Sequence, residues 1–255
     1  LNEVRKVLGI TDYYDFFNKK GIFGGFYERI RKRNSNSESK VYDEKILKQF
    51  ANIGNLKFLR DNISLDAQKY FEIGYDVKSQ GITIPIRNQI GQLIGVKERF
   101  NYDVEDGEMK YFYEYPCQMS RTLYGYSQNY KYLTNGIIYI FEAEKSTMQC
   151  YTYGIRNCVS LGSGSISKNQ IQMLLELNPK KIILMHDAGY KLEYIMRNVE
   201  LIKEYSRFLE VEVGYWNFFD KGYTGKVSPS DMGKEKLENI MRNEITMIGD
   251  DDDEL

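Results

Sequence analysis

The pattern of hydrophobic and polar positions divides the chain into two parts with different periods. In the second part, short apolar runs predict buried strands at 137–141, 157–161, 181–185 and 209–214. Stretches with helical spacing separate these runs near 144–153, 167–177 and 190–206. Such alternation is typical of a parallel sheet with helices on both faces, joined by right-handed crossovers.

The first part contains fewer helical patterns and a strand-rich centre. Two apolar stretches, 81–87 and 92–100, flank the polar turn 88–91, and this arrangement predicts a β-hairpin. A third strand is expected at 110–115. Short helices are expected between 41 and 79, one of them with Ser64 as its N-cap.

These patterns predict an α+β subdomain over 1–135, followed by an α/β subdomain with a parallel sheet over 136–235. A C-terminal helix and an acidic tail are expected over 236–255. Residues 1–135 carry 21 Lys/Arg and 17 Asp/Glu, whereas residues 136–255 carry 14 and 19. A basic first subdomain followed by a second one rich in acidic residues suits an enzyme that binds nucleic-acid phosphates with the first part and a metal ion with the second.

Composition restricts the function classes further. The 255 residues are 42% hydrophobic and 28% charged, which is ordinary for a soluble globular protein. No run of 18 apolar residues and no signal peptide is present, so we expect no membrane association. The three cysteines form no C-x-x-C pair, which excludes a zinc ribbon within the chain and favours a reducing cytoplasm. Because the first residue is Leu1, we expect a piece of a longer protein.

Two carboxylates carry the candidate chemistry. Glu142 follows the strand 137–141, and Asp187 closely follows the strand 181–185. Parallel strands bring such residues to the carboxyl edge of the sheet, where paired acids suit a divalent cation such as Mg²⁺. Further carboxylates are expected nearby: Glu144 at the same rim, and Asp220 and Asp231 from later loops. The competing interpretation of each acid is a solvated surface residue.

Two further polar features, the segment 162–165 and His186, each have two interpretations. Residues 162–165, Gly-Ser-Gly-Ser, could offer backbone N–H groups to a phosphate, or form a turn before a helix capped by Ser167. The single histidine, His186, could touch substrate, but a buried, hydrogen-bonded imidazole is favoured. One histidine argues against a His-ligated zinc centre and against a nucleophilic triad.

Several segments, taken in order, resemble the toprim-containing catalytic core of bacterial-type (DnaG-like) DNA primases, particularly the phage-encoded ones. In the second part these are Phe141–Ser146, Gly154, Val159–Gly162, Ile182–Asp187 and Ser228–Asp231. In the first part they are Phe71–Asp76, Ile84–Arg87 with Gly91, Gly95 and Arg99, then Lys110–Tyr111 and Leu123–Gly125. The ordered set spans roughly residues 65–235.

The resemblance implies an RNA polymerase core that makes short RNA primers on single-stranded DNA during replication. Glu142 matches the toprim glutamate, a metal ligand or general acid/base, and Asp187 matches the first aspartate of the D-x-D element. The chain departs from the family at position 189, where Gly189 replaces the second aspartate; Asp220 or Asp231 is the candidate replacement ligand. Ala143 also replaces the usual glycine.

The family further implies Mg²⁺ or Mn²⁺ as cofactor, with template DNA, ribonucleoside triphosphates and a replicative helicase as partners. Five cations are candidates for holding template and nucleotide phosphates: Arg87, Lys97, Arg99, Lys110 and Arg121. Two alternatives stay open. One is a toprim nuclease or topoisomerase-like enzyme, and the other is a non-catalytic nucleic-acid-binding module.

Overall fold

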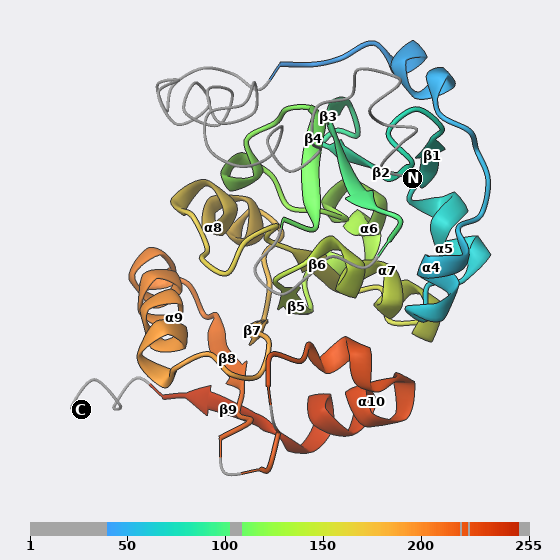
Figure 1. The fold of residues 1–255 in the computed structure, drawn as a ribbon. Helices are drawn as coiled ribbons and strands as arrows, with labels where there is room; N and C mark the ends of the chain where they lie inside the picture. Colours follow the sequence, from blue (N-terminus) through green and yellow to red (C-terminus); the bar gives the residue numbers. More distant parts are fainter. Residues whose placement is uncertain (1–39, 103–108, 220, 224, 250–255) are drawn as a thin grey trace. The chain divides into compact units, whose positions relative to one another are not determined.

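The first sheet has four antiparallel strands in the order β1-β2-β3-β4 (Figure 1). Its strands are β1 (Gly74–Asp76), β2 (Gly81–Arg87), β3 (Leu93–Phe100) and β4 (Tyr111–Tyr115). The predicted hairpin is confirmed as β2 and β3, which pair from Gly81↔Phe100 to Arg87↔Leu93. Strand β4 confirms the predicted third strand, whereas the three-residue β1 was not predicted.

The structure, a computed structural model, describes residues 40–102, 109–219, 221–223 and 225–249. These residues belong to one compact unit, Lys40–Leu255, and the other unit, Leu1–Ser39, lies outside the described residues. The predicted acidic tail also lies outside them from residue 250 onward.

The second sheet has five strands in the order β6-β5-β7-β8-β9. They are β5 (Ile137–Phe141), β6 (Cys158–Ser160), β7 (Lys181–Met185), β8 (Glu212–Trp216) and β9 (Ile245–Ile248). The first four are mutually parallel, as predicted, and β9 joins β8 in the antiparallel direction. Strand β9 was not predicted, and it places part of the segment after residue 236 in this sheet.

The helices of the second sheet follow the predicted alternation. They are α7 (Glu144–Tyr153), α8 (Lys168–Leu175), α9 (Leu192–Ser206) and α10 (Lys234–Asn243). Figure 1 shows α8 and α9 along one face, and α7 and α10 along the other. The turn interpretation of residues 162–165 is supported, because Ser167 caps α8 in a capping box with Gln170.

Short helices accompany the first sheet and connect it to the second. They are the 3-10 helices η1 (Glu44–Gln49) and η2 (Met119–Arg121), and the α-helices α4 (Leu56–Arg60), α5 (Leu65–Tyr70) and α6 (Tyr126–Leu133). Ser64 is the N-cap of α5, as predicted, and its hydroxyl accepts a hydrogen bond from the Ala67 amide. A further 3-10 helix, η3 (Pro229–Met232), precedes α10.

Helix α7 joins the cores of the two sheets. Its Met148 belongs to the core that contains Phe58, Phe71 and the isoleucines of β2, whereas Cys150 and Tyr153 belong to the core of the second sheet. Seven of the ten residues of α7 are buried, and several of these are polar. Because α7 lies between two apolar clusters, packing on both sides fixes the position of the helix that follows β5 and Glu142.

Candidate functional site

The two predicted carboxylates lie at the same edge of the second sheet. Strands β5 and β7 are neighbours and parallel, with Phe141 paired to Met185. Glu142 follows β5 directly, and Asp187 lies two residues beyond β7. The expectation that both acids emerge at one carboxyl edge, on adjacent strands, is therefore confirmed.

The Glu142 carboxylate is mostly buried and only half satisfied. Its side chain is 18% exposed, and Oε1 lies 3.2 Å from the Lys226 ammonium. The other oxygen, Oε2, is buried and has no hydrogen-bond partner among the residues that the structure describes. A buried carboxylate oxygen without a donor is costly unless a cation or water satisfies it. This oxygen fits a bound divalent cation.

The Asp187 carboxyl has a perturbed protonation equilibrium. Burial and then the negative charge of Glu142 raise its pKa to about 6, with Asp231 adding a smaller effect in the same direction. The Lys226 ammonium and a hydrogen bond from Ser228 oppose these effects. A pair of acids that repel each other in a partly dry site is the arrangement that a divalent cation stabilises.

Asp231 approaches this edge from η3 but has its own partners. Its Oδ1 accepts a hydrogen bond from Gln149 Nε2 at 2.8 Å and lies 2.6 Å from the Lys145 ammonium. Asp220, the other predicted late ligand, lies outside the described residues. Within the described part of the chain, no group of three acidic, histidine or cysteine side chains is placed to hold one metal ion.

Glu144 does not face the sheet edge as an available ligand. Both of its oxygens lie within hydrogen-bond distance of Lys97 Nζ, at 2.8 and 2.9 Å. Burial lowers the pKa of Lys97, but the Glu144 carboxylate outweighs burial, so the net pKa is raised and the lysine stays charged. This pair, with side chains 10% and 1% exposed, links β3 to the start of α7.

The other predicted phosphate-binding cations differ in their surroundings. Arg87 contacts Glu44 and Glu72, and Arg99 contacts Asp61 at 2.7 Å. Lys110 is exposed beside β4, and the half-buried Arg121 ends η2. The role of these five residues in nucleic-acid binding stays a prediction. Three of them, Arg87, Lys97 and Arg99, have structural ion pairs in this chain.

His186 is a structural residue, as the favoured interpretation predicted. The residue is 3% exposed, and its Nε2 lies 2.9 Å from the Gly164 carbonyl and 3.1 Å from Asn198 Nδ2. Burial lowers the pKa of His186, which favours the neutral imidazole. This imidazole therefore holds the 162–165 turn against α9.

The sequence analysis missed Lys226, Ser228 and Tyr190. Lys226 contacts Glu142 and lies 3.5 Å from the Tyr190 hydroxyl, whereas Ser228 bonds to Asp187. These residues belong to irregular segments, so no periodic pattern marks them. The one available signal was the late acidic element Ser228–Asp231, which begins with Ser228 and follows Lys226 closely.

Gly189, which occupies the position of the second D-x-D aspartate, has a backbone conformation that disfavours side chains. Its φ is +96°, in the region that favours glycine. A Cβ at this position would lie 3.3 Å from the Gly225 carbonyl oxygen. Segment 225–228 therefore packs closely against the position at which the family has its second aspartate and this chain has Gly189.

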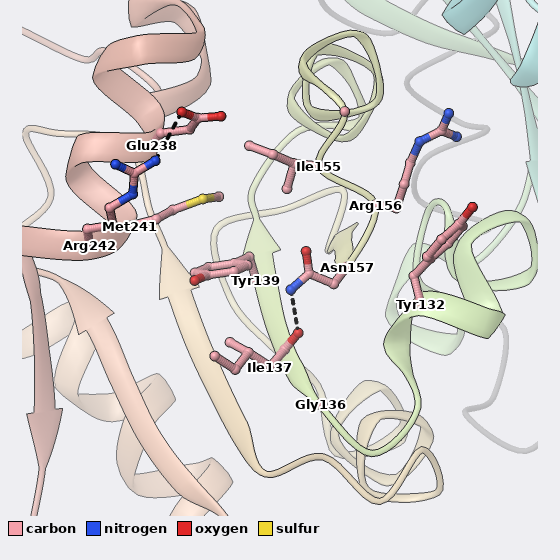
Figure 2. A pocket seen from close by; sticks show the side chains of 11 residues that line it. Tyr132, Gly136, Ile137, Tyr139, Ile155, Arg156, Asn157, Glu238, Met241 and Arg242 are labelled. Atoms are coloured by element: carbon pink, nitrogen blue, oxygen red, sulfur yellow. Dashed lines mark hydrogen bonds and ion pairs between the residues drawn. The ribbon is translucent and has the colours of Figure 1, made fainter.

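A cavity of about 640 Å³ lies at the opposite end of β5 (Figure 2). Figure 2 shows Tyr139 extending from the strand on the side of Glu238 and Arg242, and Asn157 beside the start of the strand, where its amide donates to the Ile137 carbonyl at 2.8 Å. Because Gly136 and Ile137, which line the cavity, lie at the start of β5 and Glu142 follows its end, this cavity is separate from the carboxylate pair.

No helix in the described segments combines the length and apolar character needed to cross a bilayer.

No protein-family model matches the chain. A curated relative is the SPbeta prophage-derived uncharacterized protein YorJ of Bacillus subtilis strain 168, which is 30% identical over 253 aligned positions. The match covers 87% of this chain, and the chain spans 65% of the length of that relative.

Solved structures similar to this chain are primase cores. A DnaG primase catalytic domain bound to ssDNA has a TM-score of 0.61 at 16% identity. The match covers 78% of this chain and 76% of the primase chain. The Aquifex aeolicus primase, with zinc-binding and RNA polymerase domains, has a TM-score of 0.60 at 17% identity, covering 89% and 68%. The Escherichia coli primase catalytic core has a TM-score of 0.59 at 17% identity, covering 73% and 71%.

These likenesses establish the fold. The mixed α/β architecture, with one antiparallel sheet and one mainly parallel sheet, is that of the DnaG-type primase catalytic cores. The resemblance predicted from the sequence is confirmed at this level, and the prophage relative fits its phage-type character.

Proposed function

We propose that this chain is a primase catalytic core, which joins ribonucleotides into short RNA primers on single-stranded DNA. The observation that carries the proposal is the pair Glu142 and Asp187 on adjacent parallel strands, in a chain with the DnaG-type fold. Nucleotidyl transfer needs carboxylates that converge on a divalent cation, and this edge supplies two of them.

Mg²⁺ or Mn²⁺ would be held by Glu142 and Asp187, with Asp231 nearby as a further acid. When bound, the ion supplies neutralisation of phosphate charge. The buried, unpartnered Oε2 of Glu142 supports this assignment. Asp187 must be ionised to serve as a ligand, and the positive charge of the ion would keep it so. The adjacent β5 and β7 hold the two carboxylates in place before substrate arrives, which is how such sites lower the cost of positioning.

The template and the nucleotide phosphates would bind cations of the first sheet. Lys110 is the foremost candidate, because it is exposed and its ammonium has no carboxylate partner among the described residues. The other proposed contacts are Arg121 and, through reorganisation of their ion pairs, Arg87, Lys97 and Arg99. Such an enzyme would work with a replicative helicase in the cytoplasm of a bacterium or an infected host.

The proposal is tested by primer synthesis with purified protein, single-stranded DNA, ribonucleoside triphosphates and Mg²⁺ or Mn²⁺. We expect Glu142→Gln and Asp187→Asn to abolish synthesis while the protein stays folded. Glu212→Gln is the matched control, because Glu212 begins β8 at the opposite edge of the same sheet and pairs with Lys181. Full primer yield from either folded site variant would refute the assignment.

A non-catalytic nucleic-acid-binding module is the second candidate. It is favoured by the replacement of the second aspartate by Gly189 and by the lack of a three-residue metal cluster in the described segments. This candidate predicts DNA binding without synthesis and without metal dependence. A toprim nuclease would cleave the template DNA. Analysing the same reactions for template cleavage therefore distinguishes it from both candidates.

A further inference from the structure

The segment that contains Lys226 is fixed against the end of β7. The Ala188 amide donates to the Val227 carbonyl at 2.8 Å, and Gly189 lies close to Gly225. Ser228 then contacts Ser146 of α7 at 3.1 Å. Because backbone and side-chain contacts on both sides hold this segment, the Lys226 side chain leaves it at the mouth of the carboxylate pair.

The Lys226 ammonium has contacts on two sides. It lies 3.2 Å from Glu142 Oε1, 3.5 Å from the Tyr190 hydroxyl and 5.2 Å from the centroid of the Tyr190 ring. The tyrosine is held in turn by stacking on Tyr194 at 4.8 Å between centroids. An ammonium between a carboxylate and an aromatic ring is favourably placed for both interactions.

A divalent cation bound to Glu142 Oε2 would lie close to this ammonium, which contacts Oε1 of the same carboxylate. Metal–oxygen distances are about 2.0–2.6 Å. An ion that close to Glu142 would therefore lie within a few ångströms of Lys226 Nζ, where two positive charges repel strongly. Lys226 already neutralises one of the two acids, so it also removes part of the attraction that the ion would meet.

We infer that Lys226 is a built-in counter-cation of the Glu142 and Asp187 pair, which a divalent ion must displace in order to bind. The inference rests on the proposed function, because it concerns the ion of that same site. Displacement is feasible because the Lys226 side chain is 60% exposed and its long stem can turn toward water. The chain therefore holds one of its two acids neutralised without metal, and its metal affinity is lower than the two carboxylates alone would provide.

The test is a titration of the whole protein with Mn²⁺, followed by electron paramagnetic resonance of the free ion. We expect Lys226→Met to bind Mn²⁺ about tenfold or more tightly than the native chain, because one nearby positive charge is removed. Lys226→Arg keeps the charge and is expected to bind Mn²⁺ about as the native chain does. Thermal unfolding of each variant verifies that it is folded.

Lys181→Met is the matched control. It removes the same charge at the start of β7, whereas Asp187 follows the end of that strand. Six residues of strand separate the two positions by about 20 Å, so the Mn²⁺ affinity should stay unchanged.

Equal or weaker Mn²⁺ binding by Lys226→Met, beside measurable binding by the native chain, would overturn the inference and leave the proposed metal site intact. An increase that also appears in Lys181→Met would overturn it too, because a general charge effect would explain the gain. Absence of Mn²⁺ binding in both the native chain and Lys226→Met would overturn the inference together with the metal site of the proposed function.

Discussion

At the scale of single residues, the burial of the Asp187 carboxyl costs stability. Its pKa is raised from the ordinary 3.8 to about 6 by burial and by Glu142. A group whose pKa is raised on folding contributes stability below its unfolded pKa and loses it as the pH rises through the folded pKa. The window of loss therefore lies between 3.8 and about 6, and the folded chain carries the full penalty above it.

Asp187→Asn should therefore stabilise the metal-free protein while abolishing its proposed activity. At about pH 8 we expect the free energy of unfolding to rise by roughly 1 kcal/mol, because the amide resembles the neutral carboxyl. At about pH 4 the native carboxyl is itself protonated, so the advantage should largely disappear. Urea unfolding at both pH values measures the difference. A variant less stable than the native chain at the higher pH, or a gain that does not depend on pH, would contradict this account.

Gly189 provides a second prediction at this scale. Gly189→Asp recreates the missing aspartate of the D-x-D element, but at a φ of +96° and with its Cβ 3.3 Å from the Gly225 carbonyl. We expect a loss of about 1–3 kcal/mol in the free energy of unfolding. Gly222→Asp is the control, because Gly222 has a φ of +74° and open space around its Cβ position. If both substitutions lower the free energy of unfolding by the same amount, the contact with Gly225 does not contribute to the loss, and this explanation is contradicted.

At the scale of elements, α7 is unusual in burying polar side chains on several sides. Thr147 bonds to Ser160 at 2.6 Å, and Gln149 bonds to the Asp61 carbonyl at 2.7 Å. Lys97 supplies the partner of Glu144 at the start of the helix. Each of these bonds connects α7 to a different neighbouring segment, so the helix is held in one orientation and Glu142 with it.

The Lys97 and Glu144 pair should therefore be a large determinant of stability. Lys97→Met leaves Glu144 buried without a counter-charge, and we expect a loss of about 3–5 kcal/mol. Replacing both residues by Met removes the two charges together and should recover most of that loss. Urea unfolding of the single and double variants tests this. A double variant as unstable as the single one would show that the pairing is not the reason.

The elements were largely predictable from the sequence where local patterns are strong. The apolar runs of β5 and β7 each precede a carboxylate by one or two positions, and both strands were predicted with their observed bounds. Strand β8 lies at Glu212–Trp216, a few residues later than the predicted 209–214. Strand β9 has only four half-buried residues, and its extended conformation depends on pairing with β8. Such pairing is a tertiary effect that local periodicity does not record.

The environment of individual side chains was less predictable. Lys97 was interpreted as a phosphate contact from its charge, yet its partner lies 47 positions away. For Lys226 the sequence offered only its position next to the late acidic element, because its contact with Glu142 depends on how segment 225–228 packs against Gly189. Both cases require the register between distant segments, which the sequence pattern of either segment alone does not specify.

At the scale of the whole molecule, each of the two sheets supplies a different set of residues to the proposed active site. The second sheet presents two acids at one edge, and the first carries the candidate phosphate-binding cations. Helix α7 contacts the cores of both sheets, so the two parts are joined by packing as well as by the chain. This arrangement suits an enzyme that holds template with one part and a metal ion with the other.

The central claim is that Glu142 and Asp187 hold one divalent cation between them. A crystal structure of the chain soaked in Mn²⁺, with anomalous scattering recorded, tests this most directly. The account predicts one anomalous peak with an oxygen of each carboxylate at about 2.0–2.6 Å, and Lys226 turned away from Glu142. A peak that contacts only one of the two acids, or no peak at this edge while Mn²⁺ is bound elsewhere, would contradict it.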